Sequence, residues 1–471
     1  MNSLVRQTEL TKVATSARSL LVGAGILLTT LGIGALMGWM GVLWSQGGFA
    51  PGKAVHLTQE QAEALRWATV NFSFLVVGKY VMVMNLQNPA HIKVALLSKG
   101  MNISSEERKN IGKIFQEKIY SYSITDWVDE KINFPSEIKL VDRVYVGFHY
   151  RQSSDYSLAY KIKNDNSQAL GIFRDDEFIT DAALIPRPKY YSYTSEDGSP
   201  LQAIGVSCAN HGVSFFINEY CQYFRENEEC KFCTLVPTQN RFNDVLKYKK
   251  VSHVNEAMTK IVEIEDRIDF VQLSAGSLYE HDKEVKNYIP YIQIIRKHLD
   301  NKGIYKKTRI HLTTMPPQDL DILKELKDAG LDTISFDIEC PTQQYFEKYC
   351  PGKTRTYGYQ GIRRAMEKAV EVFGKGNVFT IIIAGIEPPE SFISGTYDLI
   401  SSGITPTINI YHHDPLTTKM DINEPDPEII IDMIYEIARF FRKYNVQPGL
   451  LGCAHYDIGH EIKKGFFDYG A

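Results

Sequence analysis

The chain has 471 residues, with 52 lysine and arginine residues against 56 aspartate and glutamate residues, so its formal net charge is −4. Hydrophobic residues make up 44% and charged residues 23%, which is typical of a globular protein and excludes a largely disordered one. The slightly acidic balance argues against a general nucleic-acid binder, which needs a basic surface, so we expect no nucleic-acid partner.

The first expected element is a transmembrane helix. After an N-terminal flank, residues 1–19, comes an uncharged stretch, residues 20–44, which as a helix can cross a hydrocarbon core of about 30 Å. The alternative is a buried glycine-rich core helix, and a cleaved signal peptide fits less well because the apolar run is longer than its usual core. The basic residues that precede the span predict a cytoplasmic N-terminus: Arg6, Lys12 and Arg18.

Residues 45–88 are interpreted as a loop that contains a possible second membrane segment, residues 68–86. This stretch either completes a helical hairpin or forms two strands that turn at Gly78 and Lys79. Lys79 disfavours the hairpin because a lysine at the centre of a span costs roughly 2.5–3.5 kcal/mol on insertion scales. Its valine and aromatic content suits strands equally well.

Residues 89–200 are expected to form an α+β accessory region. The sequence predicts a helix over Ser104–Tyr120 and β-rich runs over Lys139–Tyr150 and Leu158–Ile162, punctuated by Asp, Asn, Ser and Gly. We find no metal-ligand cluster or phosphate-binding loop in this region. It is either a substrate-recognition domain or a scaffold around the part that follows.

Residues 201–445 alternate between apolar strands and helical patterns, which predicts a parallel sheet with right-handed crossovers. The expected fold class is α/β, a partial (β/α)6 TIM-type barrel followed by a C-terminal tail, residues 446–471. The first strand is either Ala203–Val206 or Ser214–Ile217. The other expected strands are Phe270–Leu273, Arg309–Thr313, Thr333–Ile338, Val378–Ile383 and Thr407–Tyr411. The expected helices are His253–Asp266, Glu284–Leu299, Gln318–Ala329, Tyr359–Phe373, Pro389–Ser401 and Asp426–Tyr444.

Three cysteines directly after the first strand indicate metal chemistry: Cys221, Cys230 and Cys233. Seven cysteines in all are too few for a disulfide scaffold in a chain of this length and favour a reducing compartment. Three thiolates on a [4Fe–4S] cluster leave one iron open, whereas a structural zinc site generally takes four ligands. The alternative is a zinc site with His211 as the fourth ligand.

A cysteine group after the first strand of a partial barrel resembles the radical S-adenosylmethionine (radical SAM) superfamily. The superfamily spacing is three and then two residues, whereas here it is eight and then two, a variant C-x8-C-x2-C motif. A polar insertion within residues 224–229 accounts for the difference if it loops out. The strand Val378–Ile383 with its following Ala-Gly-Ile-Glu-Pro resembles the biotin-synthase type of barrel.

The resemblance implies a [4Fe–4S] cluster on Cys221, Cys230 and Cys233 and an S-adenosylmethionine pocket. It also implies reductive cleavage of S-adenosylmethionine to a radical that abstracts hydrogen from a substrate. The residues that it places in the pocket are Phe232 beside the adenine, Ala275, Gly276 and Ser277 after the second strand, Glu339 after the fourth, and Gly385 and Glu387 after the fifth. Candidate catalytic residues follow the sixth strand: Tyr411, His412 and His413.

The remaining cysteines are Cys208, Cys340, Cys350 and Cys453, which either ligate an auxiliary cluster or are inert core residues. We expect a membrane-anchored enzyme whose barrel lies in the cytoplasm, with flavodoxin or ferredoxin as electron donor. For a single span, a cytoplasmic N-terminus would place the barrel outside, so we expect either that residues 68–86 complete a helical hairpin or that the N-terminus is exported despite its basic residues. The substrate is expected to be a small molecule, a lipid or a peptide. A zinc-dependent barrel enzyme and a non-catalytic metal-binding membrane scaffold are the alternatives.

Overall fold

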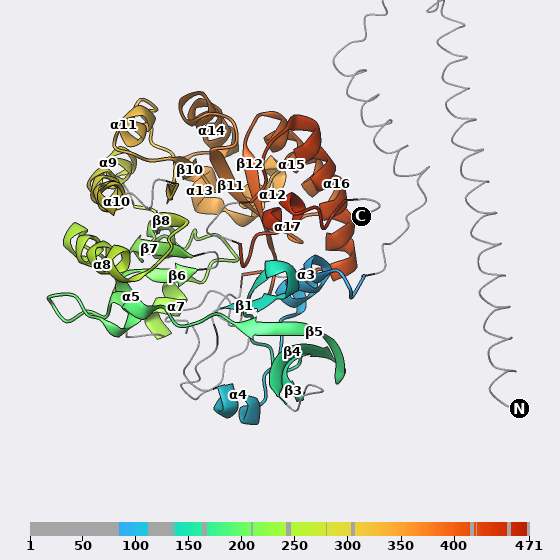
Figure 1. Ribbon diagram of the computed structural model, residues 1–471. Helices are drawn as coiled ribbons and strands as arrows, with labels where there is room; N and C mark the ends of the chain where they lie inside the picture. Colours follow the sequence, from blue (N-terminus) through green and yellow to red (C-terminus); the bar gives the residue numbers. More distant parts are fainter. Residues whose placement is uncertain are drawn as a thin grey trace, which may run out of the picture. The chain divides into compact units, whose positions relative to one another are not determined.

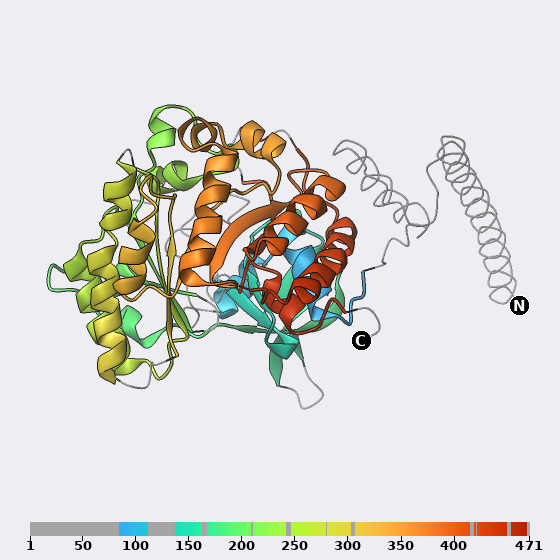
Figure 2. The same ribbon diagram turned by 90° about the horizontal axis from the view of Figure 1, so that it is seen from above.

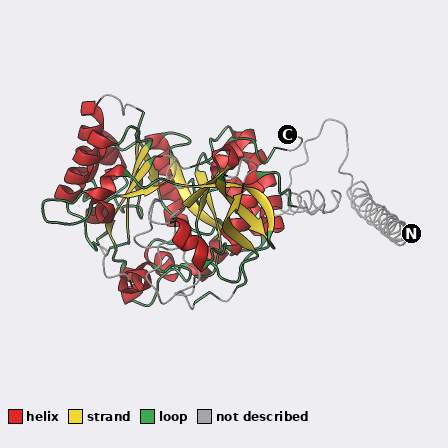
Figure 3. Cartoon of the chain, turned by 60° about the horizontal axis from the view of Figure 1, so that its bottom comes forward, coloured by secondary structure: helices red, strands yellow, loops and turns green. Residues whose placement is uncertain are grey.

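The computed structural model describes most of one compact unit, Val83–Ala471. The described ranges are residues 84–111, 135, 137–162, 167–208, 211–241, 246–278, 280–302, 307–414, 419–420, 422–449 and 454–468. Two sheets dominate this unit, one of seven strands and one of five (Figures 1 and 3).

The seven-stranded sheet is the predicted partial barrel. Its order is β12-β11-β10-β9-β8-β7-β6, and every neighbouring pair from β7 to β12 is parallel. Six parallel strands in sequence order therefore confirm the α/β class and the six β/α units. The strands are β6 (Val206–Cys208), β7 (Gly212–Asn218), β8 (Phe270–Ala275), β9 (Arg309–Thr313), β10 (Thr333–Ser335), β11 (Val378–Ala384) and β12 (Thr405–Ile410).

The first barrel strand is β7, which is the second of the two predicted alternatives. The short strand β6 pairs antiparallel with β7 and lies at the outer edge of the sheet. A three-residue edge strand of opposite direction blocks further pairing there, which is one way in which proteins protect a sheet edge.

Helices cover the outer face of the curled sheet (Figure 2). They are α8 (Val251–Ile264), α9 (His281–Lys286), α10 (Ile289–Lys302), α11 (Ile322–Asp328), α14 (Tyr359–Phe373), α15 (Pro389–Ser401) and α16 (Pro427–Tyr444). In α14 the buried side chains recur at helical spacing, so one apolar stripe packs on β10 and β11: Ile362, Ala365, Met366, Ala369 and Phe373. The predicted single helix Glu284–Leu299 is instead two helices, α9 and α10.

Shorter helices lie in the loops: α5 (Leu201–Ile204), α6 (Gln222–Arg225), α7 (Leu235–Arg241), α12 (Gln343–Tyr349) and α13 (Pro351–Thr356). Of these, α6 lies between two of the predicted cluster cysteines, and α13 begins directly after Cys350. The loops at the carboxyl ends of the strands therefore carry structure of their own.

In its described residues, the accessory region is an antiparallel five-stranded sheet with two helices. The helices are α3 (Pro89–Lys99) and α4 (Ser105–Ile111), and the 3₁₀ turns are η1 (Val141–Arg143) and η2 (Lys189–Ser192). The strands are β1 (Glu137–Leu140), β2 (Tyr145–Gly147), β3 (Tyr156–Ile162), β4 (Gln168–Arg174) and β5 (Glu177–Leu184), in the order β2-β1-β5-β4-β3. The α+β character is as predicted, and the run 139–150 is two strands, because η1 turns the chain at Asp142, whose φ is 54°.

Helix α3 joins the accessory region to the barrel. It contacts β2 on one side and β12 and α16 on the other, and ten of its eleven residues are buried. Helix α17 (Gly459–Lys463) lies beside α3, although the two are far apart in the sequence. It is folded and contains buried residues. The predicted C-terminal tail is thus part of the packed structure in its described range, residues 454–468.

Within the described ranges, no helix is both long and apolar enough to span a membrane. The predicted transmembrane helix, residues 20–44, lies outside these ranges, and so does most of residues 68–86.

Candidate active site

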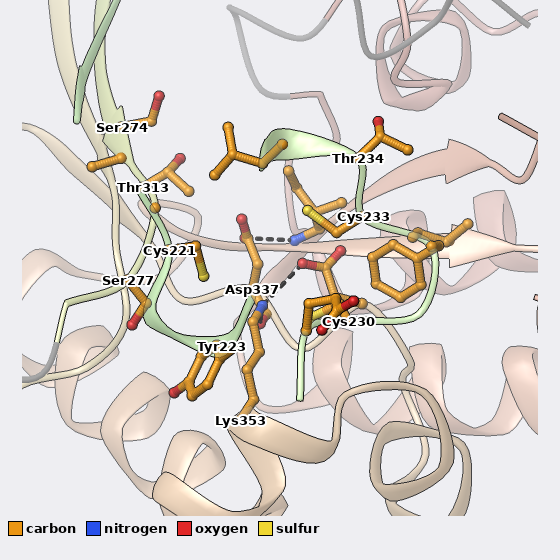
Figure 4. A pocket seen from close by; sticks show the side chains of 18 of the residues that line it. Cys221, Tyr223, Cys230, Cys233, Thr234, Ser274, Ser277, Thr313, Asp337 and Lys353 are labelled. Atoms are coloured by element: carbon orange, nitrogen blue, oxygen red, sulfur yellow. Dashed lines mark hydrogen bonds and ion pairs between the residues drawn. The ribbon is translucent and has the colours of Figure 1, made fainter. Parts of the chain in front are cut away.

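A cavity of about 420 Å³ lies at the carboxyl ends of the parallel strands (Figure 4). This is the edge at which parallel α/β folds bind ligands, and the volume falls within the range of small-molecule sites. Residues from all six barrel strands or the loops after them line it. Those that the sequence predicted are Cys221, Cys230, Phe232, Cys233, Ala275, Gly276, Ser277, Glu339, Tyr411 and His412.

The eight residues between Cys221 and Cys230 fold as one helical turn followed by an acidic turn. Helix α6 begins directly after Cys221, and Asn227 has a positive φ of 58°. Basic residues hold the acidic turn: Arg355 on α13 pairs with Glu226 and Glu228, and Lys419 pairs with Glu229. The long spacing is therefore an ordered, clamped segment.

The end of β8 fixes the start of the cysteine loop. The N–H of Gly276 donates to the carbonyl of Asn218, and the N–H of Gln222 donates to that of Ser277, both at 2.9 Å. A Cβ on Gly276 would lie 2.1 Å from the carbonyl oxygen of Tyr220, so only glycine lets the two backbones come this close. The glycine here positions the residues beside Cys221.

The three thiols differ in their electrostatic environment. Burial raises the pKa of Cys221 and raises that of Cys233 well above its ordinary value. The pKa of Cys230 is instead lowered, first by a hydrogen bond with Cys350 and further by the charge of Lys353. As a donor set, three soft sulfur atoms in one cavity suit an iron–sulfur cluster. Among the described residues, no group of three or more His, Cys, Asp or Glu side chains is gathered closely enough to hold one metal ion.

A half-buried ion pair lies beside the thiols. Lys353 Nζ donates to Glu339 Oε1 at 3.0 Å and to the carbonyl of Asp337 at 2.7 Å. Burial alone would lower the pKa of Lys353, but Glu339 and the neighbouring thiols raise it well above its ordinary value. Figure 4 shows the Lys353 side chain rising into the cavity from α13. The cavity wall thus carries an ion pair whose two partners are held by α13 and by the segment after β10.

Asp337 and Glu339 both line the cavity. The Asp337 carboxylate accepts from the N–H of Ile381 at 2.9 Å, so it replaces a sheet hydrogen bond between β10 and β11. Glu339 has a φ of 63°, an uncommon conformation for a residue with a Cβ, and both its backbone groups pair with β11. Strain of this kind is concentrated at functional sites.

The three candidate catalytic residues lie in the loop after β12, and only two of them line the cavity. Tyr411 and His412 line the cavity, whereas His413 is exposed and lies outside it. Burial raises the pKa of Tyr411 to about 12, so its phenol is neutral at ordinary pH. The next residue, Asp414, accepts a hydrogen bond at 3.2 Å from Thr234, the neighbour of Cys233.

Two of the residues predicted for the cofactor pocket do not line the cavity. Gly385 turns the chain away after β11 with a φ of 100°, and a Cβ there would meet the ring of Pro425. Glu387 accepts from the hydroxyls of Thr342 and Ser391 and is not part of the cavity wall. This placement gives neither residue a contact with the cavity.

His211 is the residue that the zinc alternative required as a fourth ligand. It is exposed and lies just before β7, whereas the cysteines follow the other end of that seven-residue strand. At about 3.3 Å per residue, the strand separates the two by roughly 20 Å. The structure therefore contradicts this ligand set.

Sequence reasoning missed Lys353 and Glu284, which both line the cavity. Lys353 lies in the Cys-Pro-Gly-Lys segment, whose unusual sequence was the available signal. No sequence signal pointed to Glu284, because a glutamate in an amphipathic helical pattern normally faces solvent. Burial raises the pKa of Glu284 to about 8, although its carboxylate accepts from the N–H of Leu278 at 2.7 Å.

The difference in free energy of unfolding between Glu284→Gln and the parent is expected to shift in favour of the variant as pH rises. Between its ordinary pKa of 4.5 and its folded pKa of about 8, the native state holds a proton that the unfolded chain has released. Parent stability therefore falls through this window, by at most about 5 kcal/mol at roughly 1.4 kcal/mol per pKa unit. Urea unfolding of both proteins at about pH 5 and about pH 9 tests this, and parallel pH profiles would contradict it.

Residues 223–398 match the family model of the radical SAM superfamily. The chain carries a radical SAM domain. The match contains Cys230 and Cys233 and begins two residues after Cys221. Residues 1–73 match a second model, a family of unknown function (DUF6753).

Relatives of this chain are distant. Bacteriochlorophyllide c C-7(1)-hydroxylase of Chlorobaculum limnaeum is 21% identical over 257 residues, which is 53% of this chain and 64% of the hydroxylase. The chain thus spans less than two thirds of that relative's length. The solved structure of methylornithine synthase (PylB) is 14% identical and covers 59% of this chain and 78% of its own, with a TM-score of 0.40. Coproporphyrinogen III oxidase (HemN) from Escherichia coli is also 14% identical. The match covers 54% of this chain and 57% of that structure, with a TM-score of 0.33.

Proposed function

We propose that this chain is a radical SAM enzyme that abstracts hydrogen from a carbon atom of its substrate. The observation that carries the proposal is the placement of Cys221, Cys230 and Cys233 in one cavity at the carboxyl ends of a half-barrel, in a domain that matches the superfamily. The likeness to a hydroxylase supports chemistry at carbon. The substrate class, whether small molecule, lipid or peptide, is left open.

In this proposal the three thiolates hold a [4Fe–4S] cluster with one open iron. When bound, the cluster and S-adenosylmethionine supply a 5′-deoxyadenosyl radical that abstracts hydrogen. The barrel wall excludes water from the cavity, and Phe232 provides an apolar face for the adenine. The Lys353–Glu339 pair orients polar groups of the cofactor, because both charges are fixed by the fold.

The wall that follows β12 faces the substrate. Tyr411, neutral at ordinary pH, holds its proton at the phenol oxygen, and His412 accepts or returns a proton at its imidazole. His412 is held from the accessory region, because its ring centroid lies 3.9 Å from that of His149. The accessory region thus contributes to the substrate end of the site.

Anaerobic reconstitution with iron and sulfide tests the proposal. We expect a brown protein whose reduced cluster gives an electron paramagnetic resonance signal that changes when S-adenosylmethionine is added. Stoichiometric zinc without such a signal would instead support a zinc-dependent barrel enzyme. A protein that binds metal but cleaves no S-adenosylmethionine would support a metal-binding scaffold.

We also propose a membrane anchor at residues 20–44 with the barrel in the cytoplasm, where flavodoxin or ferredoxin supplies electrons. The uncharged length of that segment supports the anchor, and the need of a cluster for a reducing compartment supports the location. Labelling of Cys233 by a membrane-impermeant thiol reagent in intact cells would contradict it.

A further inference from the structure

The strand β12 carries a column of polar side chains on the face that looks into the half-barrel. Asn409 and Tyr411 line the cavity. Because side chains alternate along a strand, Thr405 and Thr407 point to the same face. Tyr411 continues the ladder just beyond the strand, since its N–H donates to the carbonyl of Ala384 at 2.9 Å. The side chains between these residues are apolar and point to the opposite face.

Each of the four polar side chains has a buried oxygen atom without a hydrogen-bond partner among the described residues: Thr405 Oγ1, Thr407 Oγ1, Asn409 Oδ1 and Tyr411 Oη. The neighbouring strand β11 offers no partner, because the side chains in register with this column are Phe379, Ile381 and Ile383. A buried polar atom that lacks a partner costs about 1–3 kcal/mol. The column therefore destabilises the fold unless a bound molecule supplies partners where it opens into the cavity.

The two residues of the column that reach the cavity, Asn409 and Tyr411, both donate and accept hydrogen bonds. The carboxamide has an acceptor oxygen and two N–H donors, and the phenol oxygen donates its proton and also accepts. Burial raises the pKa of Tyr411 to about 12, so the phenol keeps its proton at ordinary pH. The group that complements both side chains is one that itself donates and accepts, which is a hydroxyl or a carboxamide.

The charged groups of the cavity wall already have partners within the fold. Lys353 is the only lysine or arginine among the residues that line the cavity, and it is bound to Glu339 at 3.0 Å. A carboxylate or an ammonium beside Asn409 and Ile383 would lose its water without gaining a free counter-charge. The other carboxylates of the wall are paired as follows: Glu229 with Lys419, Glu284 with the N–H of Leu278, Asp337 with the N–H of Ile381, and Asp414 with the hydroxyl of Thr234.

We propose that Asn409 and Tyr411 form the substrate-binding wall of the cavity and hold an uncharged hydroxyl or carboxamide group of the substrate. This inference rests on the proposed function, which makes the cavity the place of hydrogen abstraction. It narrows the substrate class, because a molecule that presents a carboxylate, a phosphate or an ammonium to β12 does not fit this wall. The two threonines lie deeper in the half-barrel, outside the cavity wall, and make no contact with the substrate.

Binding of three probes of similar size to the reconstituted full-length chain tests the inference: benzamide, benzoate and benzylammonium. S-adenosylhomocysteine at saturation occupies the cofactor end of the cavity, and ligand-detected nuclear magnetic resonance gives the dissociation constants. We expect the parent to bind benzamide at least about tenfold more tightly than either charged probe. In Asn409→Leu the affinity for benzamide is expected to fall about tenfold, and in Tyr411→Phe about threefold.

Two further variants separate this effect from a change in folding or in general polarity. Gln272→Met is the matched control, because this amide also lines the cavity but already donates to Thr313 Oγ1 at 3.3 Å. It should bind benzamide as the parent does. Asn409→Asp places a carboxylate at the same position and is expected to prefer benzylammonium to benzamide. A misfolded protein cannot show this gain.

Benzoate or benzylammonium binding to the parent as tightly as benzamide would overturn the inference, and so would the absence of benzamide binding up to its solubility limit. An equal loss in Gln272→Met and Asn409→Leu would also contradict it. Iron content and 5′-deoxyadenosine formation in the same preparations report on the proposed function separately. A parent with a cluster but without probe selectivity refutes the inference alone, whereas a parent without a cluster refutes the proposed function and the substrate role of this wall with it.

Discussion

Cys221→Ala, Cys230→Ala and Cys233→Ala are each expected to abolish formation of 5′-deoxyadenosine. Two thiolates are too few to hold a cluster with one open iron, and the three thiols line the same cavity with no further cysteine in its wall among the described residues. The loss should exceed a thousandfold, down to the background of the assay. Chromatographic detection of 5′-deoxyadenosine after reduction, together with iron content, measures both consequences.

The matched controls are the other cysteines. Cys340→Ala, Cys350→Ala and Cys453→Ala should each retain 5′-deoxyadenosine formation. Cys340 and Cys350 are fully buried and outside the cavity wall, and Cys453 lies outside the described residues. If one of these variants proves as damaging as Cys230→Ala, an auxiliary cluster is present and sulfur insertion becomes the leading chemistry.

The barrel could be predicted strand by strand because its signals are local. Parallel strands buried on both faces are continuous β-branched runs, as in Val378–Ala384, and the helices between them show one apolar stripe each. Two expected helices, Tyr359–Phe373 and Pro389–Ser401, match the observed bounds because glycine or proline marks their starts.

The site could be predicted only in part because its completion is non-local. The cysteines, Gly276 and Glu339 follow strands of a known fold, so their convergence on one edge was foreseeable. Lys353 reaches the cavity only because α13 docks on the loop that carries the cysteines, where the N–H of Gly352 donates to the carbonyl of Glu228 at 2.9 Å. The spacing of the sequence does not show this contact. Gly385 was assigned to the cofactor because of its motif, but the space that it leaves is occupied by Pro425.

The accessory region gave the weakest sequence signal, and yet it supports one wall of the cavity. Arg151, just beyond β2, forms a two-pronged ion pair with Glu424, whose carboxylate also accepts from the N–H of His413 at 3.2 Å. Together with the His149–His412 contact, this fixes the loop after β12 from outside the barrel. The accessory region thus contacts the barrel at the edge that carries the cavity.

A buried ion pair links helix α3 to the C-terminal segment, which in turn bonds to β12, because the N–H of Ile408 donates to Asp457 Oδ1 at 2.9 Å. Lys93 at the centre of α3 has no exposed surface, and its ammonium donates to Glu461 Oε2 at 2.7 Å and to the carbonyls of Ala454 and Asp457 at 2.7 and 2.6 Å. All three donors of the ammonium are therefore used. The carboxylate partner is buried as well, with 1% of its side chain exposed.

Lys93→Met is expected to lower the free energy of unfolding by about 3–5 kcal/mol, because it leaves Glu461 as a buried charge without its cation. The double variant Lys93→Met/Glu461→Met should recover most of this loss, since an apolar pair of similar volume removes the desolvation cost of both charges. Lys260→Met removes an exposed partner of Glu263 and should change stability by less than about 0.5 kcal/mol. Urea unfolding followed by circular dichroism measures all three variants. If Lys93→Met is no more destabilising than Lys260→Met, α3 does not hold the accessory sheet to the barrel through this ion pair.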